Sequence, residues 1–262
     1  NAKAVIFSTV FEADRFPEEW KPILSSVDAV VVPSKYCKIA ASSIVDEKKV
    51  FVSPHVVKRI EPDNTGLEKF IEDKSFKFLS VFSQVSHRKG LDVLVSAYYS
   101  EFEKSDNVTL YIKCPADPVS GEIIDRTIDR IGKSLPGKDT DRLPVIYIMD
   151  DNLTPNQMAG LYSNASVLVS TPRGEGFNLP PIESLTYGTP IIVTGGIGAD
   201  CLNFDNTIFD KKFGYRLPGL FDMCMTSQYN TEYYNYDTTR MKWVYPSIFY
   251  TMKHMSEAFE GG

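Results

Sequence analysis

The sequence is poor in cysteine and has no long apolar run, and each shortage excludes a class of protein. Four cysteines are spread through 262 residues, at Cys37, Cys114, Cys201 and Cys224, and none forms a CxxC pair. This spacing argues against a zinc site or a disulfide framework and favours a reducing compartment. No apolar run reaches the ~18 residues that predict a membrane-spanning helix. We therefore expect a protein without a transmembrane segment, cytoplasmic or peripheral at a membrane.

Basic charge is also in short supply. The chain has 28 lysine and arginine residues against 34 aspartate and glutamate residues, a net charge of -6. Because nucleic-acid partners usually require a basic stripe, we expect none here. The content of 43% hydrophobic and 24% charged residues is typical of one large or two modest globular domains. The chain starts at Asn1 and not at Met, so we expect a piece of a longer protein or a processed form.

The stretch STPRGEGFNLPPIESLTYGTPII, residues 170–192, is the part around which the rest of the chain is organised. It predicts a strand, a glycine-containing loop, a helix from Pro180 that ends before Gly188, and a second strand. In an open parallel sheet, ligands bind at the loops that leave the carboxyl ends of strands. Two carboxylates flank this site, Glu175 in the loop and Glu183 about one turn into the helix.

The segment EGFNLPPIE, preceded by Arg-Gly and followed by TYGTPII, resembles the E-x7-E signature of retaining, nucleotide-sugar-dependent glycosyltransferases with the GT-B fold (glycosyltransferase family 4-like). The resemblance implies that Glu175 approaches the donor sugar near the reacting centre and that Glu183 accepts hydrogen bonds from the nucleotide ribose. It also implies backbone contacts to the sugar and the β-phosphate from four residues: Gly176, Phe177, Asn178 and Leu179. Without the resemblance, Glu183 would be read as a charge that complements a helix N-terminus, or the two glutamates as a glycosidase pair.

Arg88 and Lys89 precede Gly90 in SVFSQVSHRKGLDVL, where the resemblance implies a diphosphate-binding Lys-Gly. Negative charge develops on the leaving phosphate when the bond from sugar to nucleotide breaks, and positive groups must meet it. The family often adds a Gly-Arg pair at the end of the preceding strand. That pair is absent near Phe82 and Gln84, so we expect Arg88 to stand in for it. The alternative is a solvated basic pair.

The segment YIMDDNLTPNQMAGLYSNASVLVS resembles the base-binding stretch of the same family. This implies that the nucleobase packs against the backbone near Met149 and Asp150 and against Leu153. Recognition by the backbone leaves no signal for a particular base in the side chains, so the sequence does not identify the nucleotide.

The alternation of strand and helix patterns from residue 76 onward predicts an α/β fold. With the resemblance, we expect a GT-B type Rossmann-like doubly wound parallel sheet and a truncated second Rossmann-like domain. FEADRFPEEW and VDAVVVPSKYCKIAASSI resemble the last part of the family's acceptor-side domain. The expected division is 1–55 remnant of the acceptor-side domain, 56–75 linker, 76–245 nucleotide-sugar-binding domain and 246–262 C-terminal helix.

Several further patterns carry weaker signals. Asp139 and Asp141 spell a DxD motif in a polar loop, where we expect no metal role. GGIGAD, residues 195–200, lacks the third glycine of a dinucleotide fingerprint. The aromatic cluster at 229–236 fits a packed surface loop, or a contact to a sugar or lipid acceptor. For His55 a hinge or packing role is favoured over catalysis.

The predicted function is transfer of a hexose from a nucleotide diphosphate sugar to an acceptor hydroxyl, with retention and without a metal or other cofactor, in glycan biosynthesis. The resemblance implies that the leaving phosphate helps to remove the acceptor proton, so no protein nucleophile is expected. The acceptor stays open among a glycan, a lipid and a small molecule. The alternatives are a nucleotide-sugar-binding module without transfer activity, because the acceptor domain is incomplete, and a sugar-nucleotide epimerase on the same fold.

Overall fold

The computed structural model describes residues 3–137, 139–197, 214–223 and 240–261. Its centre is a six-stranded parallel sheet in the order β6-β5-β4-β7-β8-β9. Numbered from β4, this is the doubly wound order 3-2-1-4-5-6, whose direction reverses between β4 and β7. The strands are β4 Phe76–Val81, β5 Val108–Lys113, β6 Val145–Met149, β7 Val167–Ser170, β8 Ile191–Thr194 and β9 Gly214–Leu217.

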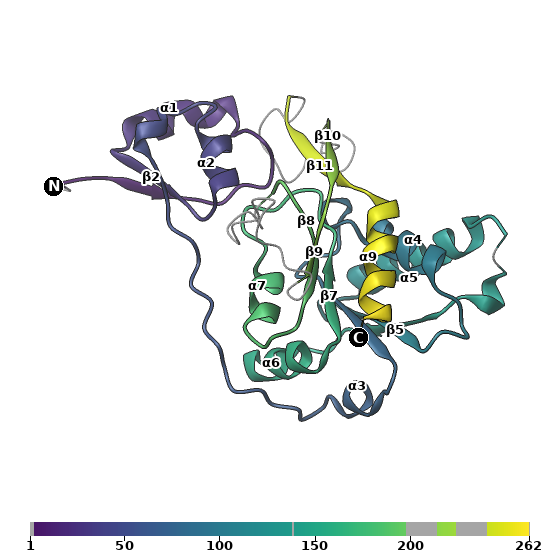
Figure 1. Cartoon of the computed structure of the whole chain (residues 1–262). Helices are drawn as coiled ribbons and strands as arrows, with labels where there is room; N and C mark the ends of the chain where they lie inside the picture. Colours follow the sequence, from purple (N-terminus) through teal and green to yellow (C-terminus); the bar gives the residue numbers. More distant parts are fainter. Residues whose placement is uncertain (1–2, 138, 198–213, 224–239, 262) are drawn as a thin grey trace.

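Helices cover both faces of this sheet because its strands alternate apolar side chains between two cores (Figure 1). Phe78 of β4 faces the core beneath one group of helices, and the next residue, Leu79, faces the core beneath the other. The first group is α4 Leu91–Glu101, α5 Pro118–Ser134 and α9 Ile248–Glu260. The second group is α3 Glu68–Glu72, α6 Pro155–Asn164 and α7 Leu179–Leu185.

The N-terminal residues form a smaller unit around a three-stranded parallel sheet, β1-β2-β3. One face of this sheet has its own core, to which Val30 and Val50 contribute. The elements are β1 Ile6–Ser8, η1 Glu18–Trp20, α1 Lys21–Ser26, β2 Ala29–Val32, α2 Lys35–Ala41, η2 Glu47–Lys49 and β3 Val50–Val52.

A two-stranded antiparallel ribbon near the C-terminus joins the two units. It pairs β10 Gly219–Met223 with β11 Lys242–Pro246. Trp243 and Val244 of β11 belong to the core of the N-terminal unit. The Val244 backbone N–H donates to the Arg173 carbonyl at 2.9 Å, on the main domain. The ribbon therefore holds the smaller unit against the end of the large sheet.

Residues 53–64 cross between the units as an extended segment without helix or strand (Figure 1). The predicted linker, 56–75, also contains α3, which buries Leu67 and Phe70 in the core of the main domain. The predicted C-terminal helix is α9, which begins two residues after Pro246. The limits of the predicted domains stay a prediction.

Two of the cysteines, Cys37 and Cys114, are buried thiols. Cys201, Cys224, Asp200 and the aromatic cluster at 229–236 lie outside the described residues. Within the described ranges, none of the helices combines the length and apolar character that crossing a bilayer requires.

Candidate active site

Most of the predicted site residues gather where the carboxyl ends of β4 and β7 meet, at the switch point of the sheet. In a doubly wound sheet this crevice is the preferred place for a ligand. A cavity of about 460 Å³ lies there, between the main domain and the N-terminal unit. The predicted residues that line it are Arg88, Lys89, Glu175, Gly176, Phe177, Asn178, Leu179 and Glu183. The cavity thus joins the loop after β4, the loop after β7 and helix α7.

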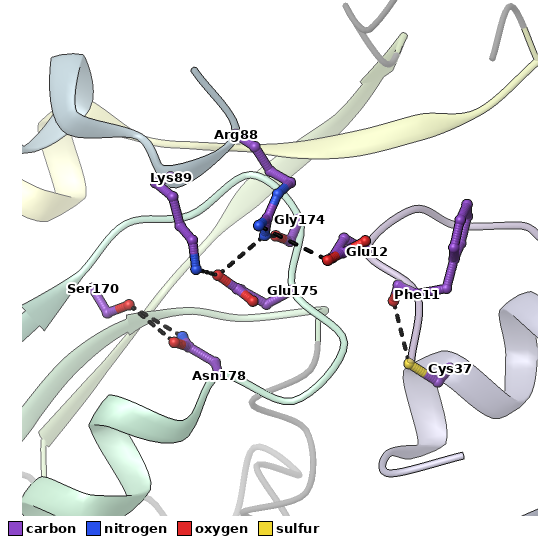
Figure 2. Close-up of polar contacts among 9 residues, drawn as sticks. All are labelled: Phe11, Glu12, Cys37, Arg88, Lys89, Ser170, Gly174, Glu175 and Asn178. Carbon is purple, nitrogen blue, oxygen red and sulfur yellow. Dashed lines mark hydrogen bonds and ion pairs between the residues drawn. The ribbon is translucent and has the colours of Figure 1, made fainter. Parts of the chain in front are cut away.

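Two basic and two acidic side chains form a charge cluster at this cavity (Figure 2). Lys89 Nζ forms an ion pair with Glu175 Oε1, and Arg88 Nη1 lies 3.2 Å from the same oxygen. Arg88 Nη2 is 3.8 Å from Glu12 Oε1, which comes from the N-terminal unit. The side chains of Arg88, Lys89 and Glu175 are 13%, 15% and 11% exposed. Partial burial strengthens these interactions relative to those of surface pairs, since water screens them less.

A glycine brings the basic pair close to the end of β7. Arg88 and Lys89 lie in the 3-10 turn η3, His87–Lys89, and Gly90 follows with φ of +69°. A Cβ on Gly90 would lie 1.8 Å from the Thr171 carbonyl oxygen. The Thr171 hydroxyl donates to the Gly90 carbonyl at 2.9 Å. Only glycine combines this left-handed conformation with so close an approach.

Arg173 braces the loop after β7 against the loop after β4. It is 2% exposed, and its guanidinium donates to both carboxylate oxygens of Asp92, at 2.8 and 2.7 Å. It also donates to the His87 carbonyl at 2.7 Å, and its backbone N–H donates to the Arg88 carbonyl at 2.6 Å. Burial opposes ionisation of Asp92, but the hydrogen bonds and charge of Arg173 outweigh it and lower the pKa of that carboxyl.

Asn178 adopts a left-handed conformation, with φ of +65°, directly before α7. Asparagine is one of the few residues other than glycine that enter this region readily. Its side-chain amide donates to the Ser170 hydroxyl at 3.1 Å (Figure 2). This bond ties the end of the loop to the end of β7, so the loop is anchored at both ends.

The N-terminal unit closes the other side of the cavity. A Cβ on Gly176 would lie 2.1 Å from Val10 Cγ2, and one on Gly174 would lie 2.1 Å from the Glu12 carbonyl oxygen. The Cys37 thiol donates to the Phe11 carbonyl at 3.3 Å (Figure 2) and lies 3.4 Å from the Gly176 carbonyl oxygen. The two glycines therefore permit close packing of the loop on the smaller unit.

Glu183 lines the same cavity as Lys89 but contacts a different group. Its Oε2 accepts a hydrogen bond from the Tyr162 hydroxyl at 2.7 Å. Burial, followed by the charge of Glu183, raises the pKa of Tyr162, which therefore keeps its proton. A second cavity of about 270 Å³ adjoins the first and shares Met158, Tyr162 and Glu183 with it.

The predicted base-binding residues do not all lie at a cavity. Leu153 lines the second cavity, but Met149 is buried in the core at the end of β6, and Asp150 is exposed. Neither of the latter two lines either cavity. His55 lines the first cavity and packs edge-on against Phe177, with ring centroids 4.7 Å apart.

Glu12, Tyr162 and Arg173 are site residues that the sequence did not single out. All three are defined by contacts across more than twenty positions of the chain. Asp139 and Asp141 lie at the 3-10 turn η4 Thr140–Arg142, where Asp139 caps the turn. Within the described part of the chain, no group of three His, Cys, Asp or Glu side chains is arranged to hold a metal ion.

No protein-family model matches the chain, and no curated protein matches it. Solved structures do match. HepE from Anabaena, in complex with UDP-glucose, is 13% identical with a TM-score of 0.60, over 81% of this chain and 58% of that one. Sucrose-phosphate synthase from Thermosynechococcus elongatus is 19% identical with a TM-score of 0.58, over 76% and 47%.

TarM from S. aureus, in complex with UDP and other ligands, is 13% identical with a TM-score of 0.61, over 97% of this chain and 43% of that one. The chain therefore spans about half the length of the structures it matches. These neighbours have the GT-B fold, so the similarity confirms the predicted fold class, a Rossmann-like doubly wound sheet with a second, smaller Rossmann-like unit. At these identities the comparison concerns the fold.

Proposed function

We propose that this chain carries the donor site of a retaining glycosyltransferase of the E-x7-E type. The reaction moves a hexose from a nucleotide diphosphate sugar to an acceptor hydroxyl in glycan biosynthesis, in the cytoplasm or at the periphery of a membrane. One observation carries the proposal: Lys89, Glu175 and Glu183 line a single cavity at the switch point of a doubly wound sheet. This combination provides cations for a diphosphate and carboxylates for hydroxyl groups.

Arg88 and Lys89 are the groups proposed to bind the diphosphate. Arg88 and Lys89 are held at the cavity wall by a fixed turn and by the brace of Arg173. Preorganised cations stabilise the charge that develops on a leaving phosphate without rearranging during the reaction. In this proposal they also supply the charge that a divalent metal provides elsewhere, so the reaction requires no added metal.

The surroundings of Glu175 support a role other than nucleophile. Its Oε1 is engaged by Lys89 and lies 3.2 Å from Arg88 Nη1. Two cations stabilise the carboxylate and so reduce its tendency to attack a sugar carbon. We therefore assign Glu175 to contacts with the donor sugar, and the leaving phosphate helps to remove the acceptor proton. Transfer then occurs on one face of the sugar, which retains its anomeric configuration.

The neighbours suggest where to begin with the donor. The HepE structures are complexes with UDP and glucose and with UDP-glucose, and the TarM structure contains UDP. A UDP-hexose is thus the first donor to assay. The nucleobase of this chain's own donor stays open, because the contacts proposed for it come from backbone and apolar groups near Leu153.

The test is a panel of UDP-, GDP- and ADP-hexoses, incubated with candidate glycan, lipid and small-molecule acceptors. Proton NMR of the product reports the anomeric configuration, and a parallel reaction with EDTA reports the need for a metal. The proposal expects a product with the donor's configuration at an unchanged rate in EDTA. An inverted product contradicts retention. Nucleotide binding without product supports the binding-module alternative, and free sugar with nucleotide in the absence of acceptor supports the epimerase.

A further inference from the structure

The Tyr162 hydroxyl makes a buried contact with Glu183 that the proposed donor chemistry does not yet use. Tyr162 is 3% exposed and donates to Glu183 Oε2 at 2.7 Å. Tyr162 lies on α6 and Glu183 on α7, so the bond crosses two helices. Both residues lie where the two cavities adjoin.

Tyr162 is held in place through both its backbone and its ring. Its carbonyl accepts from the Thr189 hydroxyl at 2.7 Å. The ring of Tyr187 stacks against it, with centroids 6.4 Å apart and 17° between planes. The Tyr187 hydroxyl in turn accepts from the Ile60 backbone N–H at 3.1 Å and donates to its carbonyl at 3.0 Å. Tyr162 is therefore a rigid donor, anchored to Thr189 and, through Tyr187, to the segment that joins the two units.

A rigid donor on one carboxylate oxygen fixes the orientation of the other. A glutamate side chain has three rotatable bonds and loses rotamer freedom when it is held. An ionised carboxylate only accepts hydrogen bonds, at about four lone-pair positions. With Oε2 bound to Tyr162, Glu183 Oε1 has no partner within the described part of the chain. That oxygen is available to accept from a ligand.

We propose that Tyr162 is a positioning residue for the nucleotide ribose. It holds the Glu183 carboxylate in the orientation in which the 2′- and 3′-hydroxyl groups donate to it. The inference rests on the proposed function and extends it: discrimination between a ribonucleotide and a deoxynucleotide depends on a tyrosine that does not itself need to touch the ligand.

Isothermal titration calorimetry tests this role with UDP and 2′,3′-dideoxy-UDP. The proteins are wild type, Tyr162→Phe, Glu183→Gln and the double variant. We expect Tyr162→Phe to weaken UDP binding by about tenfold, the size of one hydrogen bond to a charged group. Binding of dideoxy-UDP should not change. The double variant should bind UDP no more weakly than Glu183→Gln, because the two changes remove one interaction.

Tyr98→Phe is the matched control. Tyr98 is fully buried, and its hydroxyl donates to the Val145 carbonyl at 2.9 Å, away from both cavities. Its variant should bind both nucleotides as the wild type does. Equal weakening of UDP and dideoxy-UDP by Tyr162→Phe, or additive losses in the double variant, overturns the positioning role while leaving the donor site intact. If the wild type binds none of UDP, GDP and ADP, the proposed function fails first.

Discussion

Lys89 and Glu175, 86 residues apart in the sequence, form an ion pair at the switch point of the large sheet. The lysine comes from the loop after β4 and the glutamate from the loop after β7. Arg88 joins the pair from one side and connects it to Glu12 of the N-terminal unit. The cations proposed for the diphosphate are thus paired with carboxylates, and this pairing leads to the first two predictions.

Replacing Lys89 with alanine should lower kcat/KM for the donor by about a hundredfold or more, as the loss of one preorganised charge in an active site does. Arg88 remains, so some activity should persist. Lys133→Ala removes an equal charge from the exposed face of α5 and should have no effect. Initial rates of donor turnover provide the measurement. Wild-type kcat/KM in the Lys89 variant would refute the assignment.

Replacing Glu175 with glutamine should change binding and turnover in opposite directions. The variant loses the carboxylate that neutralises Lys89 and Arg88, so inorganic pyrophosphate should bind about tenfold more tightly. Donor turnover should fall, because the contact to the sugar is lost. Glu122→Gln, on the exposed side of α5, is the control. Calorimetry and rate measurements on the same samples decide, and weaker pyrophosphate binding would show that Glu175 does not compete with the phosphate.

Replacing Asp92 with asparagine should lower the free energy of unfolding at pH 7 by about 3 kcal/mol, because Arg173 is left buried without its counter-charge. Asp129→Asn breaks an exposed pair on α5 and should change stability by less than about 0.5 kcal/mol. Urea unfolding measures both. If Asp92→Asn lowers the free energy of unfolding as little as Asp129→Asn does, the Arg173–Asp92 pair contributes little to stability.

The same pair predicts the pH dependence of wild-type stability. The pKa of Asp92 is lowered from its ordinary value of 3.8, so the folded state binds its proton less readily than the unfolded state does. The stabilisation is therefore complete above that ordinary value and is lost as pH falls through the lower, folded pKa. Urea unfolding between pH 7 and pH 2 should show this loss in the wild type. Asp92→Asn should lack this component of the loss, and parallel acid profiles would contradict the prediction.

Replacing Gly174 with alanine should destabilise the protein by about 2 kcal/mol, since overpacking a close contact forces neighbours apart. The new Cβ would lie 2.1 Å from the Glu12 carbonyl oxygen and 2.7 Å from Trp243 Cδ1. Gly121→Ala is the matched change, with no atom within 4 Å in the interior of α5. It should stabilise by about 0.5 to 1 kcal/mol. Thermal denaturation compares them, and equal melting temperatures would contradict the tight junction.

The strands and helices from β4 to β8 could be predicted because each has its own apolar pattern and end signals. Thr154, for example, caps α6 with a complete capping box. β11 could not be predicted in this way. The expected division places residues up to 245 in the nucleotide-sugar-binding domain, but Trp243 and Val244 are buried in the core of the N-terminal unit. Such a strand is set by long-range packing, which periodicity does not report.

The site residues differ in the same way: some lie in local sequence motifs, and others are set by long-range contacts. Glu175, Glu183 and Lys89 could be assigned because they lie in short motifs with fixed neighbours. Arg173 was visible in the same stretch but had no apparent role, since Asp92, its partner, lies 81 positions away. Tyr162 reaches Glu183 only through the packing of α6 on α7. The sequence therefore predicted the groups proposed to meet the ligand but missed the groups that hold them in place.

The central claim is that Lys89 binds the diphosphate of a nucleotide and that Glu183 accepts hydrogen bonds from the ribose of the same nucleotide. Calorimetry with UDP and UMP, on the wild type and on Lys89→Ala, tests it most directly, because the two ligands differ by the phosphate in question. We predict that the wild type prefers UDP by about tenfold or more, the contribution of one charge-assisted contact, and that Lys89→Ala binds the two equally. A full preference for UDP in the variant would contradict the claim.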